Sequence, residues 1–293
     1  MERSEVVLCN KNHIETDLLL NTLLPKNSCR CRYKPTYLPI PKLCGKIENV
    51  YYGALNLRTP SINESLEIFK GCFNSPIKAV LDVGAQTKTQ FLIDAFPNAF
   101  HYLFEPVQMY HSSLRSNYKS AEIKYELIPC AVSEEPGRMY QHLLSSDESG
   151  TVTHSQLLAE KQIEKFGAHL LDIIETPVIS LDQWATESSL CSPYALKVDV
   201  DGIEDLIIAG ARKVISRSTL FIVESTLAKI SSRISAIESM GMQLFDIAGN
   251  GYYYGQLSQV DLIFVSSRIV QQNIEFRPWE KHGKVIWEHW QQY

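Results

Sequence analysis

From residue 76 onward, short apolar runs alternate with stretches of helical periodicity, and this alternation limits the possible folds more than any other feature of the chain. The apolar runs are 78–83, 100–104, 126–132, 195–200, 219–223 and 261–265. The helical stretches are 87–96, 107–118, 203–215 and 227–240. Continuous apolar runs separated by amphipathic helices are typical of parallel strands that are buried on both faces. The sequence therefore predicts an α/β fold with a doubly wound, mostly parallel sheet.

The later part of the chain adds detail to this expectation. The segment 249–255, GNGYYYG, has the composition of a hairpin turn and precedes the run 261–265. We therefore expect a seven-stranded sheet in which 219–223 is central and 261–265 belongs to an antiparallel closing pair. The segment 155–174 is expected to be a helical insertion between strands, placed where it could act as a lid.

The chain before this sheet has a different character. Ile14–Leu24 has the pattern of a short helix, and the five prolines between residues 25 and 60 favour loops wrapped on a core. The next predicted helix, over 61–70, begins with a capping box, because Ser61 is followed by Glu64 three residues later.

These observations divide the chain into three predicted parts. Residues 1–75 form an N-terminal extension of helices and Pro-rich loops, which is a candidate cap over a substrate. Residues 76–270 form the α/β domain, and residues 271–293 form a C-terminal tail packed on the core.

The charge balance argues against one broad class of partner. The chain has 28 Lys and Arg against 33 Asp and Glu, a net charge of −5. Because neutralising a phosphate backbone needs concentrated positive charge, we expect no nucleic-acid partner. No run of 18 apolar residues occurs, so no membrane span is expected. The start, MERSEVVLCN, is charged and lacks an apolar signal core, which predicts a cytoplasmic protein.

Cysteine usage gives no sign of a metal site. The chain has seven cysteines, and an odd number without a signal sequence favours reduced thiols. Cys29 and Cys31, with Cys9 and Cys44 nearby, suggest zinc at first sight. Their spacing fits no regular zinc pattern and no paired histidine motif follows, so we expect ordinary thiols and no bound metal.

The first chemical motif is the apolar strand that ends in Asp82 and turns at Gly84 and Ala85. In an open α/β sheet, ligands bind where strands end at their carboxyl side, and glycine lets the backbone approach a ligand closely. Positions 86 and 88 are Gln and Lys, so the GxGxxG pattern of a dinucleotide site is absent. An acidic first turn suits a ligand with an amino-acid or nucleoside part, while the alternative is that Asp82 only caps the next helix.

The second motif is Glu105, which ends the run FHYLF and precedes Pro106. It lies 23 residues after Asp82, close to the offset of about 20 residues at which an acid at the second strand tip meets ribose hydroxyls. A carboxylate can accept two hydrogen bonds from a vicinal diol. The alternative is a solvated acid at a strand end.

The third motif is a group of carboxylates after the run 195–200. The strand ends at Asp199, Asp201 and Gly202 turn the chain, and Glu204 and Asp205 begin a helix. Carboxylates at one strand tip can hold a substrate hydroxyl, receive its proton or bind a cation. We interpret Glu204 and Asp205 as capping and dipole residues, and leave both a capping and a functional role open for Asp201.

Together these motifs resemble the FkbM-type family of S-adenosylmethionine-dependent methyltransferases, which reads D-V-G-A-N, F-E-P and K-I-D-V-E-G-x-E before a helix that ends in G-A. The corresponding segments are Asp82–Gln86, Phe104–Pro106, Lys197–Glu204 and Gly210–Ala211. Further similar segments follow in the family's order: Ala131–Ser133, Ser149–Thr151, Ile179–Asp182 and Phe221–Glu224. The resemblance covers about 76–266, and the ordered set is specific although each motif alone is weak.

The resemblance implies a class I, Rossmann-like methyltransferase fold and S-adenosylmethionine as cofactor. The cofactor-binding residues that it implies are Asp82 near the ammonium, Gly84 and Ala85 under the methionine part, Gln86 in the same loop, Glu105 on the ribose with Pro106 after it, and Cys130 and Ala131 along the adenine. Asp199 would lie closest to the transferred methyl group.

The chain departs from the family pattern at three positions. Gln86 and Lys88 replace the usual Asn and Gly, and Asp201 stands where the family has Glu. A lysine near a sulfonium would repel it, unless Lys88 points outward or pairs with an acid.

The leading hypothesis is an O-methyltransferase that acts on a hydroxyl of a sugar, glycolipid or secondary metabolite in biosynthesis, with a small-molecule or glycan acceptor. A hydroxyl nucleophile must lose its proton, for which Asp199, Asp201, Glu224 or His154 are candidates. His154 follows SGTVT and is otherwise an exposed loop histidine. A divalent cation held by the carboxylates is the alternative route to an acidified hydroxyl.

Two other classes stay open. A nicotinamide-dependent oxidoreductase could use the same kind of sheet, but the missing GxGxxG counts against it. A non-catalytic binding protein on the same fold is favoured by Gln86 and Lys88. The sequence predicts no oligomeric state.

Overall fold

The computed structural model describes residues 61–72, 77–146, 150–188 and 190–272. The predicted helix Ile14–Leu24, the Pro-rich loops and the four cysteines before residue 61 lie outside the described residues. The predicted tail 271–293 also lies outside them from residue 273 onward.

Helix α1 (Ile62–Cys72) confirms the helix that the capping box predicts. The backbone N–H of Glu64 donates to Oγ of Ser61 over 3.2 Å. One face of this helix is buried through Leu66 and Phe69, so the amphipathic pattern and the cap act on the same element.

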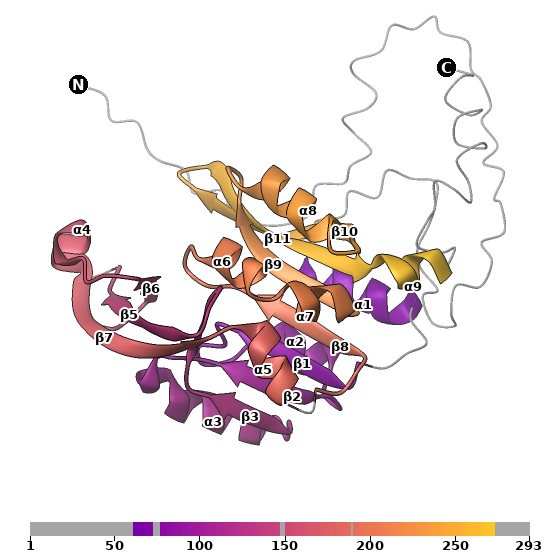
Figure 1. Ribbon diagram of the computed structural model, residues 1–293, viewed down its shortest axis with the longest axis horizontal. Helices are drawn as coiled ribbons and strands as arrows, with labels where there is room; N and C mark the ends of the chain where they lie inside the picture. Colours follow the sequence, from indigo (N-terminus) through magenta and orange to yellow (C-terminus); the bar gives the residue numbers. More distant parts are fainter. Residues whose placement is uncertain (1–60, 73–76, 147–149, 189, 273–293) are drawn as a thin grey trace, which may run out of the picture. The chain divides into compact units, whose positions relative to one another are not determined.

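The large sheet has seven strands in the order β10-β11-β9-β8-β1-β2-β3 (Figure 1). Their bounds are β1 (Ala79–Val83), β2 (Phe100–Phe104), β3 (Tyr125–Ile128), β8 (Tyr194–Val198), β9 (Leu220–Thr226), β10 (Met242–Tyr253) and β11 (Gln256–Ser266). Every pairing is parallel except those of β11, which runs antiparallel to both β9 and β10. The predicted doubly wound, mostly parallel sheet with an antiparallel closing pair is confirmed.

The position of 219–223 needs a correction. This run forms β9, which is internal, but the middle place belongs to β8. The β10–β11 hairpin adds two strands beyond β9, while β1, β2 and β3 extend the other side. At the hairpin tip, Tyr254 and Gly255 have φ angles of 51° and 77°. Positive φ at both central residues is the geometry of a type I′ turn, so GNGYYYG does form the expected hairpin.

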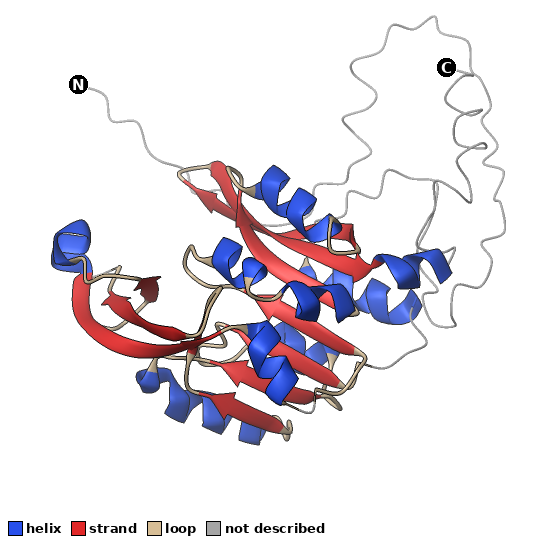
Figure 2. Ribbon diagram, viewed as in Figure 1, coloured by secondary structure: helices blue, strands red, loops and turns tan. Residues whose placement is uncertain are grey.

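Helices cover both faces of the large sheet (Figure 2). On one face lie α1, α2 (Gln90–Ala95), α3 (His111–Ser120) and α9 (Ser267–Gln272). On the other lie α5 (Leu181–Glu187), α6 (Glu204–Ala209), α7 (Arg212–Arg217) and α8 (Ile230–Glu238). Successive strand residues serve opposite cores, as Val80 packs with the first group and Leu81 with the second. This arrangement explains why the strands are apolar throughout rather than alternating.

The segment 155–174 is the main correction to the predicted fold. It forms β6 (His154–Leu158), the short α4 (Ile163–Phe166), a 3-10 turn η2 (Gly167–His169) and the start of β7 (Leu170–Ile179). With β4 (Ala131–Val132) and β5 (Gly137–Leu144), these strands make a second sheet in the order β4-β7-β5-β6. The helical prediction is wrong for most of the segment, because β7 is rich in β-branched residues and finds pairing partners on both sides.

A second correction concerns the run 126–132, which forms two strands, β3 and β4, in different sheets. Pro129 stands between them and has no N–H to donate to a ladder. Within the described segments, no helix combines the length and the apolar character needed to cross a membrane.

Two further family-like segments have structural roles between the elements. The carboxylate of Asp182 accepts from the backbone N–H groups of Lys213 (3.0 Å) and Val214 (2.9 Å), so it caps α7 from outside the helix. A Cβ on Gly210 would lie 2.4 Å from the carbonyl oxygen of Ser133, so the chain after α6 needs glycine to pass the chain after β4.

We predict that Asp182→Ala lowers the free energy of unfolding by about 1–2 kcal/mol, since two N–H groups at the start of α7 lose their acceptor. Urea denaturation measures this cost. Asp94→Ala is the matched control, because its exposed carboxylate accepts from the side chain of Gln90 and caps no backbone N–H group among the described residues. Equal costs for the two variants would contradict the capping role.

Candidate active site

A cleft lies at the carboxyl ends of β1, β2, β3 and β8 and contains about 630 Å³ of space free of atoms, part of it open to solvent. The lining residues that the sequence singles out are Gly84, Gln86, Glu105, Pro106, Cys130, Ala131, Asp199 and Asp201. The small sheet contributes Gln141, Ser155 and Leu157 to the same cleft.

Glu105 connects the first two loops of the cleft. One carboxylate oxygen accepts from the backbone N–H of Gln86 (2.7 Å) and the other from that of Val107 (2.8 Å). The side chain is only 3% exposed, and burial raises its pKa to about 7, although both N–H groups oppose this shift. Each oxygen keeps a further lone pair that can accept a hydrogen bond.

Gln86 and Lys88, the two departures from the family pattern, have different structural meanings. Gln86 has a φ of 48°, the left-handed region that Asn tolerates better than Gln. The Gln86 backbone thus adopts the left-handed conformation at this turn, and its N–H donates a hydrogen bond to Glu105. Lys88 is exposed and is not among the residues that line the cleft.

Gly84 lets the loops after β1 and β8 meet. Its φ is +84°, and a Cβ there would lie 2.0 Å from the carbonyl oxygen of Asp199. The N–H of Asp199 donates to the carbonyl of Val83 over 3.1 Å. Asp199 is thus fixed at its backbone by β1, while its side chain is 45% exposed.

Lys197 lies under these two loops and is 3% exposed. Its Nζ is 3.4 Å from Oδ1 of Asp82 and 3.3 Å from Oδ2 of Asp199, and it donates to the carbonyl of Gly84 over 3.2 Å. Burial alone would lower the pKa of Lys197, but the two carboxylates raise it above its ordinary value. The lysine therefore stays charged and joins the two strand ends.

Asp82 is the register partner of Lys197 on β1 and is completely buried. It does not line the cleft, and neither does Ala85. Helix α2 begins after Thr89 without a side-chain cap, so the alternative of Asp82 as a helix cap has no support.

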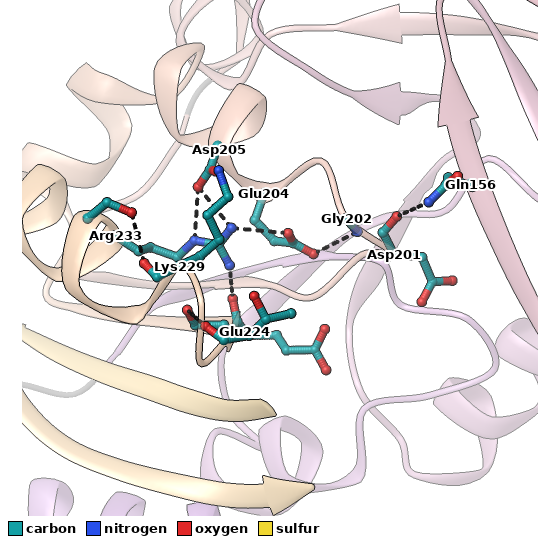
Figure 3. Close-up of polar contacts among 11 residues, drawn as sticks. Gln156, Asp201, Gly202, Glu204, Asp205, Glu224, Lys229 and Arg233 are labelled. Atoms are coloured by element: carbon teal, nitrogen blue, oxygen red, sulfur yellow. Dashed lines mark hydrogen bonds and ion pairs between the residues drawn. The ribbon is translucent and has the colours of Figure 1, made fainter. Parts of the chain in front are cut away.

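A second cation, Arg233 of α8, holds the other side of the loop after β8 (Figure 3). Its guanidinium donates to the carboxylates of Glu204 (3.3 Å) and Asp205 (2.8 and 3.0 Å) and to the carbonyl of Glu224. Glu204 in turn accepts from the N–H of Gly202 over 3.1 Å. Glu204 and Asp205 are therefore partners of Arg233, in addition to standing in the first turn of α6.

Asp201 ties this loop to the small sheet. Its carboxylate accepts from the N–H of Ser155 over 3.0 Å. Its carbonyl lies 3.5 Å from Nε2 of Gln156, a contact shown in Figure 3. Partial burial raises the pKa of Asp201, while the Ser155 N–H lowers it. Asp201 therefore has a structural partner and still borders the cleft.

Glu224 and Asp261 face one another as register partners on β9 and β11. Burial and neighbouring acids, Asp199 first, raise the pKa of Glu224 to about 8 and that of Asp261 to about 7. Glu224 accepts from Nε2 of Gln259 over 2.6 Å and does not line the cleft. At neutral pH it is mainly protonated, which disfavours it as a base.

His154 lies at the exposed start of β6, where its Nδ1 is 2.9 Å from Oγ1 of Thr153. It lines a second hollow, together with Lys165, Phe166 and His169, and is not among the residues of the main cleft.

Cys130 and Ala131 line the main cleft after β3. Burial raises the pKa of the Cys130 thiol to about 11, so it stays neutral. Among the described residues, no three His, Cys, Asp or Glu side chains lie so that they could share a metal ion.

Three residues of the site were missed by sequence reasoning. Lys197 interrupts the apolar strand ALKVDV, and Arg233 occupies the i+3 position of the apolar stripe that Ile230 and Ile237 define in α8. Both residues could have been identified from the sequence, because a charged residue at a buried position needs a charged or polar partner. Gln141 gave no signal, since its strand was not predicted.

We predict that Gly84→Ala destabilises the protein more than Gly241→Ala. Both glycines have φ of +84°, but a Cβ on Gly241 meets nothing within 4 Å. The control should cost about 1–2 kcal/mol for the left-handed backbone alone. Gly84→Ala should cost about 1–3 kcal/mol more, because the loops after β1 and β8 must separate. Equal free energies of unfolding would show that the loops are not in close contact.

Several solved structures are similar to the chain. A methyltransferase FkbM from Methylobacillus flagellatus KT is 15% identical, with 70% of this chain and 48% of that chain covered and a TM-score of 0.40. A precorrin-6y C5,15-methyltransferase from Geobacter metallireducens GS-15 is 14% identical, with 69% and 87% covered and a TM-score of 0.37. TrmK of M. capricolum, in complex with S-adenosylhomocysteine, is 8% identical, with 70% and 66% covered and a TM-score of 0.39. The chain spans about half the length of the first of these structures.

No curated protein matches the sequence. A family model described as the methyltransferase FkbM domain matches residues 82–244, more than half of the 293-residue chain. The match begins at Asp82 and contains Glu105 and Asp199, so the resemblance seen in the sequence is confirmed. The chain, with its cleft at the strand ends of a doubly wound sheet, belongs to the methyltransferase FkbM domain family.

Proposed function

We propose that this protein is an S-adenosylmethionine-dependent O-methyltransferase that acts on a hydroxyl of a sugar, glycolipid or secondary metabolite. The observation that carries the proposal is that one cleft contains Glu105 at the end of β2 and Asp199 and Asp201 at the end of β8. A diol-binding acid and a pair of acids for a hydroxyl substrate thus face the same space.

The residues present fit the cofactor. The buried carboxylate of Glu105 accepts one backbone hydrogen bond at each oxygen and can accept another at each, which suits the two hydroxyls of a ribose. Ala131 and the neutral thiol of Cys130 offer an apolar wall for a purine ring. Lys88 does not line the cleft, so its positive charge would not repel the sulfonium of a cofactor bound there.

S-adenosylmethionine, when bound, supplies a methyl group on a positively charged sulfur. The chain's own residues would orient the acceptor and remove its proton. Asp199 has a fixed backbone and a half-exposed carboxylate beside Lys197, which suits it to orient a hydroxyl. Asp201, whose pKa is raised by partial burial, is the preferred candidate to receive the proton. Glu224 and His154, which do not line the cleft, stay as secondary predictions.

The charge of the cleft favours a neutral acceptor over a polyanion. The carboxylates of Asp199 and Asp201 border the cleft. Lys197 is buried beneath this edge and is already paired with Asp82 and Asp199. A phosphate backbone would meet net negative charge here, which supports a glycan or small-molecule acceptor.

A direct test incubates the protein with S-adenosylmethionine and panels of neutral glycosides, amines and RNA oligonucleotides. Mass spectrometry then detects products heavier by one methyl group. The proposal expects transfer to hydroxyls of neutral acceptors. Transfer to nitrogen or to RNA alone would overturn the O-methyltransferase assignment while leaving cofactor use intact.

We predict that Asp199→Asn lowers kcat by about 10²–10⁴-fold, because the hydroxyl loses the group that orients it and helps deprotonate it. Binding of S-adenosylhomocysteine should persist. Wild-type activity should not change after EDTA treatment if the carboxylates act without a metal. Loss with EDTA and recovery with Mg²⁺ would favour the metal alternative. Full turnover of Asp199→Asn in both conditions would contradict both readings.

We predict that Glu105→Ala weakens S-adenosylhomocysteine binding by about 2–3 kcal/mol, since charge-assisted hydrogen bonds to the ribose are lost. Glu105 also holds two backbone N–H groups, so a ligand control is needed. The 2′-deoxy analogue should bind wild type more weakly than S-adenosylhomocysteine, and the difference should vanish in the variant. If calorimetry finds the same difference in both proteins, the ribose assignment is wrong.

A further inference from the structure

Gln141, in β5 of the small sheet, lines the cleft and has a side-chain oxygen that lacks a hydrogen-bond partner. The residue is 6% exposed and lines the cleft, and its Oε1 is buried without a hydrogen-bond partner. Among the described residues, five buried polar side-chain atoms lack such a partner, and only this one belongs to a residue that lines the cleft. A buried amide oxygen without a partner costs stability, so a ligand that donates to it after a rotation of the side chain would remove a defect of the free protein.

The strand pairing shows where in the cleft this amide lies. Gln141 is directly opposite Leu157 in the antiparallel pair of β5 and β6, so both side chains are on one face. Leu157 packs against Ala131, which follows β3. Two residues along β5, on the same face, Leu143 packs against Val107, which follows Glu105. Gln141 therefore lies between the wall at Ala131 and the chain that follows the ribose-binding candidate.

Most of the side chains along the wall after β3 offer no strong hydrogen-bonding group to the polar edge of a base. Ala131 and Leu157 are apolar, Pro106 has no N–H, and Cys130 offers only a weak thiol donor. A side-chain amide carries a donor and an acceptor side by side. Adenine presents the complementary pair in its exocyclic amine and the neighbouring N7, and bidentate contacts to these two atoms are how Gln recognises adenine in DNA. Hypoxanthine presents two acceptors at the same edge, so it cannot pair with both atoms of the amide.

We propose that Gln141 recognises the amino edge of the adenine ring of S-adenosylmethionine, so that the small sheet determines the base specificity of the cofactor site. The inference rests on the proposed function, because it takes the cofactor to lie with its ribose at Glu105. Gln141 is a specificity residue that touches the cofactor and takes no part in methyl transfer.

Isothermal titration calorimetry with two ligands tests this assignment. S-adenosylhomocysteine carries the exocyclic amine, and S-inosylhomocysteine carries a carbonyl in its place. Wild type should prefer the adenosyl ligand by roughly 10- to 100-fold. Gln141→Leu should bind S-adenosylhomocysteine roughly tenfold more weakly or worse and should lose most of the preference. Gln141→Glu, which keeps an acceptor for the amine, should retain a preference for adenine.

Thermal unfolding without ligand separates recognition from a structural role. Gln141→Leu should unfold at or above the wild-type temperature, because an unpaired buried amide is replaced by an apolar side chain. Gln183→Leu, on the exposed side of α5, is the matched control and should change neither preference nor affinity. If Gln141→Leu does not fold, Gln141→Met, which is closer in shape, takes its place in the titrations.

The outcomes distinguish a failure of the proposed function from a failure of the role of Gln141. If wild type binds neither ligand, the proposed function fails and this inference fails with it. If wild type binds S-adenosylhomocysteine and the Gln141 variants keep its preference, only the inference fails. Unchanged cofactor binding with weakened acceptor turnover in Gln141→Leu would also overturn it and would place Gln141 at the acceptor.

Discussion

The buried contact of Lys197 with Asp82 and Asp199 is the interaction on which the site depends. Strand order reverses between β1 and β8, and in open α/β sheets the crevice at such a reversal is where ligands bind. Lys197 lies at this point and joins Asp82, near the end of β1, to Asp199, directly after β8. A buried ion pair is weak evidence for stability, since its desolvation opposes its attraction. Its value here is positional, because it fixes Asp199 relative to the loop that begins with Gly84.

The loop after β8 is held from three directions, which suits a group that must orient a substrate. Lys197 and the β1 backbone hold Asp199, Arg233 holds Glu204, and the small sheet holds Asp201. Side chains that are locked by such contacts keep their geometry when a ligand arrives. The same arrangement brings several acids together, and these acids add to the effect of burial in raising the pKa of Glu224. Proteins commonly accept lost stability of this kind at functional sites.

The sequence predicts the parts of this protein that depend on local pattern. Continuous apolar runs placed the parallel strands, and the 23-residue offset from Asp82 to Glu105 identified two acids at neighbouring strand ends. The small sheet was not predictable in this way, because the half-exposed β7 owes its structure to pairing with β4 and β5. Contacts that cross between elements were missed for the same reason. Asp82 and Lys197 are 115 residues apart and meet only because their strands pair in register.

The small sheet is part of the cleft because it is attached to the large sheet at three points beside it. Ser155 donates to Asp201, Leu143 packs on Val107, and the hydroxyl of Tyr110 donates to the carbonyl of Val152. These contacts join β5, β6 and the loop before β6 to the chains that follow β8 and β2. Side chains on the inner face of this sheet can therefore change what the cleft binds while the buried strands of the large sheet stay the same. The large sheet thus determines the fold, and the small sheet forms part of the wall of the cleft.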